Sequence, residues 1–301
     1  MRGILFACVA ALTACAPSDG STDGGPLRIV ATTGQVADAA RVVGGDDVVV
    51  DALMGPGVDP HLYKASAGDL EKLRKADVVF YNGKGLEGKM ADVLAKLARK
   101  KRVRAVSESI PDRDLLRPKE LEGHYDPHIW FDVKLWIKAV NVIMSELAEA
   151  APAQADTFRA NAARFKRELA ALDAQIRTGL NEIPKERRVL ITSHDAFRYY
   201  GRAYDMEVRG LQGISTVSQA GVKDVQDLAQ LIVARRIKAI FVETSVAPKA
   251  IRAVQEAAKR KGWNVKIGGE LYSDAMGDHA PVNTYLGMMR ANLKTLVEAL
   301  K

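Results

Sequence analysis

Cysteine is almost absent from this chain, because only Cys8 and Cys15 occur among its 301 residues. Cys8 lies inside the apolar run Gly3 to Leu12, which follows a single arginine and has the charge and length of a secretory signal rather than of a membrane span. Removal of residues 1–14 as a signal peptide would leave a mature chain with Cys15 alone. Such a chain forms no internal disulfide, so the stability of its fold must come from a hydrophobic core.

The N-terminal segment also contains the tetrapeptide Leu12-Thr13-Ala14-Cys15. It resembles the lipobox of bacterial lipoproteins, in which the chain is cut before the cysteine and the new N-terminal cysteine is lipidated. The following residues, Ala16 to Pro26, are rich in Gly, Ser and Asp, which predicts a flexible tether. We therefore expect residues 15–26 to be a lipidated tether, with Cys15 as the lipid attachment site. The protein would be exported and anchored to the cell membrane, facing the periplasm or the cell exterior; the alternative is a plain signal peptide with a chance cysteine.

The chain has no excess of acidic residues. Its net charge is +7, and loss of Arg2 with the signal peptide lowers this to +6, from 43 Lys and Arg against 37 Asp and Glu. In a cytoplasmic protein this balance would favour a nucleic-acid partner, but export removes that partner and the basic residues are scattered. We expect no nucleic-acid binding, and we interpret the densest cluster, Arg99 to Arg104, as a solvated surface.

Disorder is not expected, because 48% of the residues are hydrophobic and 27% are charged, as in ordinary globular proteins. Residues 27–150 and 186–301 show the same alternation of short β-branched runs with amphipathic stretches, and residues 151–185 separate them. Between Ala153 and Leu180, apolar residues recur at steps of four and three, which places them on one face of an α-helix. The sequence therefore predicts an α/β fold of two (β/α)4 lobes with parallel sheets, joined by one long linking helix.

The two lobes are expected to contain four strands each. In the N-terminal lobe the strands are expected at Leu27–Ala31, Val48–Leu53, Asp77–Tyr81 and Val103–Val106, and the helices between them at Gln35–Val43, Ser66–Lys75 and Leu86–Lys100. In the C-terminal lobe the strands are expected at Val189–Thr192, Glu207–Arg209, Ala239–Val242 and Val265–Ile267, and the helices at Ala196–Tyr204, Val222–Arg236, Pro248–Lys261 and Asn283–Ala299. Parallel sheets bind ligands in the loops beyond the C-terminal ends of their strands, so a site is expected there.

The loop Gly83-Lys84-Gly85-Leu86-Glu87-Gly88 matches the dinucleotide-binding fingerprint in its letters, with Glu108 twenty residues further on. However, it follows the third strand of its lobe rather than the first, and nicotinamide cofactors are not expected outside the cytoplasm. We favour another interpretation, in which the glycines allow a tight turn and the close approach of a helix.

Histidine is also scarce, with five in the chain, and two of them end identical Asp-Pro-His triplets. One triplet is Asp59-Pro60-His61, in a turn rich in glycine and proline after the second strand, and the other is Asp126-Pro127-His128. Proline restricts the backbone on both sides of itself, so each triplet presents its histidine from a stiff segment. Asp132, a few residues later, is a suitable N-cap for the helix that follows.

Two further candidates come from the C-terminal lobe. His194 follows the first strand of this lobe, and Asp274 lies in a glycine-flanked loop expected to start after Ile267. Alone, each would have a structural interpretation, because a histidine at a strand end is more often hydrogen-bonded and a loop aspartate usually forms a turn. Together with His61 and His128 they offer three imidazoles and one carboxylate, which suit zinc, manganese and related divalent ions.

The segments around these four residues resemble the ligand segments of the zinc- and manganese-binding solute-binding proteins of ABC importers. They are Gly57-Val58-Asp59-Pro60-His61-Leu62-Tyr63, Asp126-Pro127-His128-Ile129-Trp130-Phe131-Asp132, Ser193-His194-Asp195-Ala196-Phe197 and Gly269-Glu270-Leu271-Tyr272-Ser273-Asp274-Ala275-Met276-Gly277. The resemblance covers essentially the whole mature chain. It implies a two-lobed binding protein with a rigid linking helix, which carries one divalent ion in the cleft between the lobes. Its partners would be an ABC transporter permease and, through the lipid, the membrane, and we expect a monomer.

The resemblance assigns four ligands to one transported zinc or manganese ion: His61, His128, His194 and Asp274. The third position is often Glu in manganese-specific members, whereas it is His194 here. Zinc-specific members often carry a long histidine-rich loop before the second ligand, whereas Pro111–Tyr125 is short and holds only His124. The sequence therefore leaves both metals open.

Two other functions stay open from the residues. One is an exported zinc-dependent hydrolase, in which His194 or Asp274 is a catalytic group, and the other is a surface interaction lipoprotein with a structural metal. We favour binding without catalysis, because four protein ligands close a site and leave little open coordination for the activation of water. The chain also lacks the His-Glu-x-x-His spacing of common zinc proteases.

Overall fold

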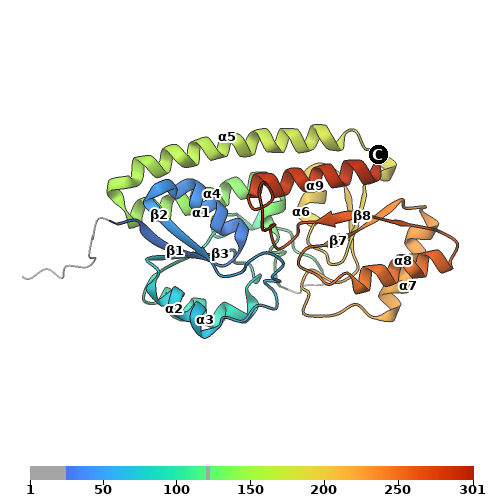
Figure 1. Cartoon of the computed structure of the whole chain (residues 1–301), viewed down its shortest axis with the longest axis horizontal. Coiled ribbons are helices and arrows are strands. Elements are labelled where there is room, and N and C mark those ends of the chain that lie inside the picture. Colours follow the sequence, from blue (N-terminus) through green and yellow to red (C-terminus); the bar gives the residue numbers. More distant parts are fainter. Residues whose placement is uncertain (1–24, 120–122) are drawn as a thin grey trace, which may run out of the picture.

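The computed structural model describes residues 25–119 and 123–301. The expected signal peptide, Cys15 and most of the expected tether lie outside the described residues. Within the described ranges, no helix is both long enough and apolar enough to cross a bilayer. The chain forms two lobes that lie side by side, and one long helix runs along both of them (Figure 1).

The first lobe is built on a four-stranded parallel sheet, as predicted. Its strands, in the spatial order β2-β1-β3-β4, are β1 (Leu27–Ala31), β2 (Val48–Ala52), β3 (Val78–Tyr81) and β4 (Arg102–Ala105). The helices that connect them are α1 (Gly34–Gly44), α2 (Ala67–Lys75) and α3 (Ala91–Ala98). Val78, Val79 and Phe80 of the inner strand β3 are all fully buried, as expected for a parallel sheet that is covered on both faces.

The second lobe also has four strands, which form two parallel pairs. The pairs are β5 (Val189–Thr192) with β6 (Glu207–Gly210), and β7 (Ala239–Glu243) with β8 (Lys266–Leu271). β5 lies beside β7, so the two pairs are neighbours. The connecting helices are α6 (Arg198–Tyr204), α7 (Val222–Ala234) and α8 (Lys249–Arg260). In both lobes the C-terminal ends of the strands lead into loops. Parallel sheets bind their ligands in such loops.

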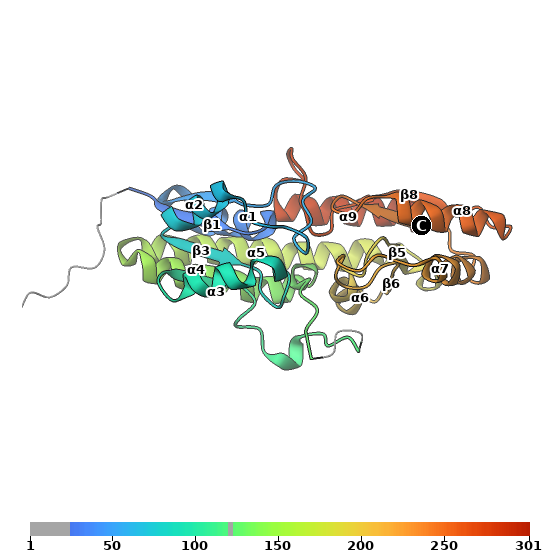
Figure 2. The same ribbon diagram turned by 90° about the horizontal axis from the view of Figure 1, so that it is seen from below.

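The linking helix is α5 (Ala155–Leu180), which has 26 residues and follows α4 (Val133–Ala150). It starts two residues later than predicted, because Pro152 opens a 3₁₀ turn over Pro152–Gln154. The predicted apolar stripe is buried in full: Phe158, Ala162, Phe165, Leu169, Leu172, Ile176 and Leu180. Figures 1 and 2 show α5 extending along both lobes, and at about 1.5 Å per residue it is roughly 39 Å long.

A second helix, α9 (Tyr285–Leu300), also reaches both lobes. It packs against α5 along the upper side of the molecule (Figure 1), and its first residue contacts the first lobe. Tyr285 donates its backbone N–H to Asp38 Oδ2 at 2.8 Å and its hydroxyl to the Trp130 carbonyl at 2.6 Å. The Tyr285 ring also stacks on Trp136, with ring centroids 5.2 Å apart. The sequence places this helix in the C-terminal lobe alone and does not predict these contacts.

The last strand is longer than predicted. β8 continues to Leu271, so Gly268 and Gly269 belong to the strand and not to the loop that carries Asp274. A Cβ at Gly268 would lie 2.7 Å from Ala299 Cβ, so the glycine allows α9 to pack closely on β8. The glycines therefore serve packing between a strand and a helix.

The glycine turn after β3 does not open a helix directly, because α3 begins at Ala91 after a 3₁₀ turn. The predicted tight turn is confirmed by positive φ angles at Gly83 (85°) and Gly85 (88°). The predicted close approach of a helix is wrong, because a Cβ at Gly83 would instead lie 2.7 Å from Ser107 Oγ, beyond β4. The carboxylate of Glu87 accepts hydrogen bonds from the backbone of this turn, so the turn encloses a buried acidic group.

Candidate metal centre

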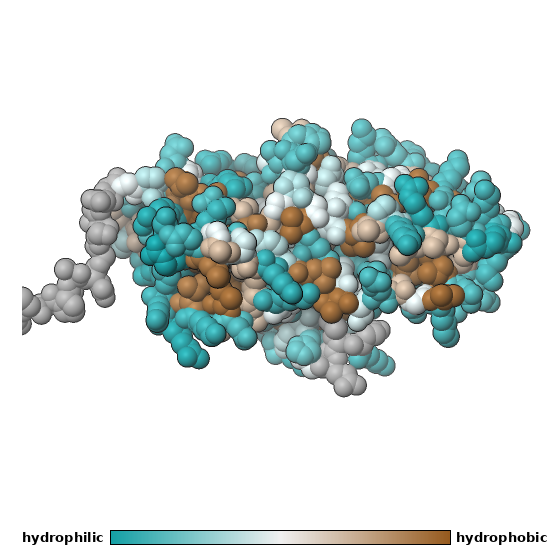
Figure 3. All heavy atoms as spheres, turned by 60° about the horizontal axis from the view of Figure 1, so that its bottom comes forward, coloured by the Kyte–Doolittle hydropathy of each residue, from teal (hydrophilic) through white to brown (hydrophobic). Residues whose placement is uncertain are grey.

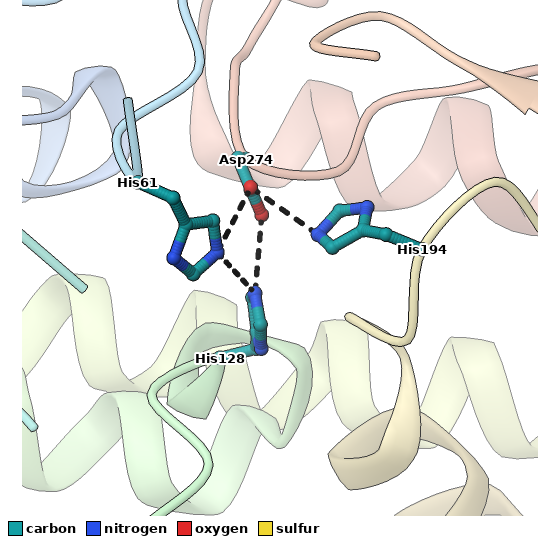
Figure 4. Close-up of side chains that lie close together, drawn as sticks. All are labelled: His61, His128, His194 and Asp274. Carbon is teal, nitrogen blue, oxygen red and sulfur yellow. Dashed lines mark hydrogen bonds and ion pairs between the residues drawn. The ribbon is translucent and has the colours of Figure 1, made fainter. Parts of the chain in front are cut away.

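Four side chains converge between the lobes from four different loops (Figure 4). His61 follows β2 and His128 precedes α4 in the first lobe, whereas His194 follows β5 and Asp274 follows β8 in the second. Three of the four therefore lie beyond the C-terminal end of a strand, where parallel sheets place their ligands. The structure brings together all four residues that the sequence analysis selects.

The ligand atoms of these side chains all lie within 4.8 Å of one another. Asp274 Oδ2 lies 3.6 Å from His61 Nε2 and 3.3 Å from His194 Nε2, and Asp274 Oδ1 lies 3.4 Å from His128 Nε2. The Nε2 atoms of His61 and His128 are 3.3 Å apart. Every histidine thus presents its Nε2 atom to a common point beside the carboxylate (Figure 4).

These separations are similar to those between neighbouring ligand atoms of one metal ion. Bonds of about 2.0–2.2 Å from a metal to histidine nitrogen and carboxylate oxygen place tetrahedral ligand atoms roughly 3.3–3.6 Å apart. Direct hydrogen bonds within a structural cluster would bring the heavy atoms to about 2.7–3.2 Å. The four separations, from 3.3 to 3.6 Å, lie in the range for ligand atoms of one ion, with Asp274 Oδ2 facing His61 and His194 and Oδ1 facing His128.

The site is buried. The exposed fractions are 0% for His128 and His194, 2% for Asp274 and 4% for His61. His194 Nε2 and both carboxylate oxygens of Asp274 have no hydrogen-bond partner among the described residues. A buried carboxylate that accepts no hydrogen bond is costly, and a bound cation would satisfy these atoms. The donor set and its burial therefore fit a divalent metal.

The two Asp-Pro-His triplets position their histidines in the same way. In each, the aspartate Oδ1 accepts a hydrogen bond from the histidine N–H two residues further on, at 2.9 Å from Asp59 to His61 and at 3.0 Å from Asp126 to His128. This arrangement is an Asx-turn, and it adds to the stiffness of the central proline. The aspartate and the proline of each triplet therefore both help to orient its histidine.

Two carboxylates contact the far side of the histidine rings. His128 Nδ1 lies 2.7 Å from Asp126 Oδ1, and His194 Nδ1 lies 2.5 Å from Glu243 Oε2. Glu243 Oε1 also accepts a hydrogen bond from the His194 backbone N–H at 2.8 Å. A carboxylate at Nδ1 keeps the proton on that nitrogen and leaves the Nε2 lone pair for the ion.

Glu243 is the residue of this site that the sequence analysis misses. It is the last residue of β7, it is 2% exposed, and it reaches His194 because β7 lies beside β5. The only trace of it in the sequence is a carboxylate that directly follows the predicted strand Ala239–Val242. The two strands are almost 50 residues apart in the chain, so their contact produces no pattern in the local sequence.

The loop that carries Asp274 leaves the second lobe and is held by the first. Gln35 Nε2 donates to the carbonyls of Ser273 at 3.3 Å and Asp274 at 3.1 Å. Trp130 Nε1 donates to the Ser273 carbonyl at 3.2 Å. Gln35 lies in the first turn of α1, and Trp130 lies two residues beyond His128, so the second-lobe carboxylate is fixed beside the first-lobe ligands.

Burial and charge give the ligands different protonation behaviour. Burial lowers the pKa of His61 to about 3, and the attraction of Asp274 only partly opposes this. Burial also disfavours protonation of His194, but the carboxylates of Glu243 and Asp274 raise its pKa well above the ordinary value. Burial alone would raise the pKa of Asp274, yet His194 and His128 hold it below the usual range. His61 and Asp274 are thus ready to bind a cation at neutral pH.

The two remaining histidines do not belong to the group. His124 is exposed, and His279 is exposed with its Nδ1 2.7 Å from Asp278 Oδ1. They provide natural controls for experiments on the buried histidines.

The fold and the site together define the class of two-lobed α/β proteins with an ion site between the lobes. Residues 29–299 match the family described as ZnuA, zinc-uptake complex component A, periplasmic. The chain belongs to this family, which confirms the resemblance inferred from the four segments.

Individual relatives match along their whole length. The chain is 50% identical over 303 residues to the manganese-binding lipoprotein MntA of Bacillus subtilis (strain 168), covering 100% of this chain and 98% of that protein. It is 45% identical over 308 residues to the zinc-binding protein TroA of Treponema pallidum (strain Nichols), covering 100% and 99%. It is 29% identical over 306 residues to the metal ABC transporter substrate-binding lipoprotein ScbA of Streptococcus cristatus, covering 99% and 97%.

The fold agrees with a solved relative. The structure of the periplasmic zinc-binding protein TroA from Treponema pallidum superposes with a TM-score of 0.90 at 46% sequence identity, covering 92% of this chain and 99% of that one. Relatives named for manganese and for zinc therefore match this chain to a similar degree.

Proposed function

We propose that this protein is the extracytoplasmic substrate-binding lipoprotein of a metal ABC importer. It captures one zinc or manganese ion between its lobes and delivers the ion to a permease for uptake. The proposed ligands are His61, His128, His194 and Asp274. The observation that carries the proposal is the convergence of four ligand atoms, two from each lobe, at separations that suit a tetrahedral ion.

The names of the relatives support a role in transport. ScbA is a metal ABC transporter substrate-binding lipoprotein, MntA is a manganese-binding lipoprotein, and TroA is a zinc-binding protein. A site shared by two lobes also suits a carrier, because separation of the lobes removes two ligands at once. The partner of the loaded protein would then be the extracytoplasmic face of the permease.

Export and anchoring form part of the proposal. Residues 1–14 would be removed, residues 15–26 would form the tether with lipid on Cys15, and residues 27–150 and 186–301 would be the lobes on either side of the linking segment 151–185. Changing Cys15→Ser should release the protein from membranes or block its processing. Unchanged membrane fractionation and an unchanged mass in this variant would contradict the anchor.

Binding without catalysis follows from the ligand count. Four protein ligands complete a tetrahedral shell, whereas catalytic zinc sites keep a position open for water. Turnover of ester or peptide substrates by the zinc-loaded protein would favour a hydrolase instead.

Native mass spectrometry of protein purified without added metal tests the proposal, followed by competition between zinc and manganese. We expect one ion per chain, and we expect zinc to bind more tightly than manganese, which lies lowest in the stability order of divalent first-row metals. Alanine variants of the four proposed ligands should lose the ion, whereas His124→Ala and His279→Ala should keep it. An ion that stays bound in a ligand variant would remove that residue from the site.

A further inference from the structure

The outer end of the first lobe carries a cationic surface that metal binding does not use. The parallel strands of the first lobe begin at this end, and the helices that connect them end here. A shallow hollow of about 550 Å³ lies here, and one acidic residue, Asp77, lines it beside six cationic ones. We call these six, together with the adjacent exposed Arg99, the basic end: Arg28, Arg74, Lys75, Lys100, Lys101 and Arg102.

Neighbouring carboxylates neutralise the basic end only in part. Arg28 pairs with Asp77 at 3.2 Å, and Glu71 is shared by Arg74 at 2.7 Å and Lys75 at 3.2 Å. These contacts are exposed to solvent, so they hold the side chains weakly. The side chains can therefore turn towards another anion at little cost.

The remaining cations differ in what they contact. Lys101 Nζ donates to backbone carbonyls at the C-terminal end of α2, including that of Ala76 at 2.5 Å, where a helix favours positive charge. Arg102 pairs with Glu146 at 2.9 Å. Arg99 and Lys100 are exposed and pair with no carboxylate in the described part of the chain.

The opposite end of the molecule is also basic, and Lys259, Arg260 and Lys261 lie there at the end of α8. The corresponding hollow at the start of β7 and β8 is lined by three lysines and one glutamate, Lys238, Lys266, Lys301 and Glu298. Lys301 also pairs with Glu182 at 2.7 Å. Positive charge alone therefore does not distinguish the first-lobe end from the opposite end.

The basic end lies where the proposed tether joins the folded chain. β1 starts at Leu27 and Arg28 is the next residue, while 11 residues, Ala16 to Pro26, separate β1 from Cys15. A segment of 11 residues spans at most about 40 Å when fully extended, and about 18 Å on average if it is the tether that the sequence predicts. A lipid on Cys15 would thus hold the basic end closer to the bilayer than the rest of the molecule. At the left of Figure 3, hydrophilic side chains (teal) lie at the outer edge of the first lobe, with hydrophobic ones (brown) beside them.

We propose that the basic end docks on the anionic phospholipid headgroups of the membrane that carries the anchor. Lys and Arg side chains are attracted to such a surface within a Debye length, about 8 Å at physiological ionic strength. A lipid chain combined with a polybasic patch is a common route to stable attachment. Docking would hold the first lobe against the bilayer and leave the second lobe free to move. This inference depends on the proposed lipid anchor at Cys15.

The test uses the full lipidated chain on vesicles of phosphatidylcholine, with and without phosphatidylglycerol. Acylation of Cys15 leaves no other thiol in the mature chain, so a fluorophore on Ala98→Cys, the exposed last residue of α3, labels the basic end alone. Ala253→Cys, exposed on α8 of the second lobe, is the matched control position. Lipids with a nitroxide on the headgroup quench whichever label touches the bilayer.

We expect quenching at position 98, much weaker quenching at position 253, and a requirement for phosphatidylglycerol. Raising salt from about 0.1 M to 1 M shortens the Debye length from about 10 Å to 3 Å and should abolish the quenching. Each charge removed should weaken docking about 5-fold, so the variant Lys75→Gln, Arg99→Gln, Lys100→Gln should weaken it roughly 100-fold. The control variant Lys259→Gln, Arg260→Gln, Lys261→Gln removes the same charge from the end of α8 and should change docking less than about 5-fold.

Three results would overturn the proposal: equal quenching at both positions, quenching that is independent of phosphatidylglycerol, or equal effects of the two triple variants. Flotation of the wild-type protein with phosphatidylcholine vesicles tests the anchor separately, because those vesicles carry no net charge. Metal binding by both triple variants, measured by native mass spectrometry, tests the proposed function separately from the docking surface.

Discussion

The three buried histidines are held in different ways, although they present the same nitrogen. His128 and His194 each have a carboxylate at Nδ1, whereas the aspartate of the His61 triplet directs its second oxygen elsewhere. Asp59 Oδ2 accepts a hydrogen bond from Thr216 Oγ1 at 2.5 Å, so this carboxylate joins two lobes and leaves the ring of His61 alone. The aspartates of the two identical triplets thus make different contacts in the same site.

The Glu243→Gln variant tests the role of the carboxylate behind His194. The amide carries no charge to hold the Nδ1 proton, so Nε2 is a poorer ligand, and we expect metal affinity to fall about 10- to 100-fold. Competition with a zinc chelator measures the change. Glu298→Gln, on an exposed face of α9, is the matched control and should bind like the wild type. Wild-type affinity in Glu243→Gln would show that Glu243 serves only the fold.

The pH dependence of metal binding follows from the two shifted histidines. His61, with its pKa lowered to about 3 by burial, is already neutral at pH 5.5 and should not compete with the metal for a proton. The pKa of His194 is raised well above 6.5 by Glu243 and Asp274, so its proton must leave on binding. One released proton weakens binding about 10-fold per pH unit, or roughly 100-fold from pH 7.5 to 5.5.

Chelator competition at several pH values measures this dependence. His194→Ala should retain weaker binding with a shallower pH profile, whereas His279→Ala should keep the wild-type profile. A flat profile in the wild type would contradict a protonated His194 in the free protein.

The four candidate ligands could be found from the sequence because each lies in a recognisable segment. Glu243 could not, because its role depends on which strands are neighbours. Asp126 is visible in its triplet, but only the structure shows that one oxygen serves both the backbone and the ring of His128. The candidate ligands are thus recognisable from the local sequence, whereas the groups that contact them depend on tertiary contacts.

At the scale of elements, α9 is the unexpected feature. Its periodicity predicts a helix, and a helix is found, but the pattern does not say that Tyr285 fits between Asp38 and Trp136 of the other lobe. The same limit explains why the end of β8 is predicted wrongly. Gly268 and Gly269 suggest a loop in the sequence, but in the structure they allow α9 to pack closely on the strand. Periodicity identifies an apolar face and does not identify the surface that it covers.

The Tyr285→Phe variant tests how firmly α9 is attached to the first lobe. It removes the hydroxyl that donates to the Trp130 carbonyl and leaves this buried acceptor unpaired. We expect the free energy of unfolding to fall by about 1–3 kcal/mol, measured by urea denaturation. Tyr272→Phe is the matched control, because Tyr272 is half-buried and its hydroxyl has no described partner. Equal stability of both variants would show that the Tyr285 hydroxyl contributes nothing.

At the scale of the whole molecule, the two lobes are connected at several levels, among them α6, whose Tyr199 hydroxyl donates to the Asp126 carbonyl at 2.9 Å and whose Arg202 pairs with Asp132 at 3.3 Å. α5 and α9 run along both lobes, the Asp274 loop is hydrogen-bonded to Gln35 and Trp130, and Asp59 contacts Thr216. The contact between Asp59 and Thr216 joins the loop that carries His61 to a surface loop of the second lobe. Because α5 spans both lobes as one continuous helix, we expect the lobes to separate by small rotations that break the smaller contacts.

The Thr216→Val variant tests whether the contact with Asp59 keeps the site closed. Valine preserves the volume of threonine but cannot donate, and Asp59 Oδ2 loses its partner across the lobe boundary. A hydrogen bond to a charged group contributes about 1.5–3 kcal/mol, so its loss should shift the balance between closed and open forms by roughly 10- to 100-fold.

The ligands are unchanged in this variant, so the effect should appear mainly as faster metal dissociation, which chelator-trapping kinetics measure. Thr295→Val, the same substitution at a half-buried position of α9, is the control and should release metal at the wild-type rate. If Thr216→Val also released metal at the wild-type rate, the other contacts between the lobes would be sufficient to keep the site closed. The contact between Asp59 and Thr216 would then only orient the turn before His61.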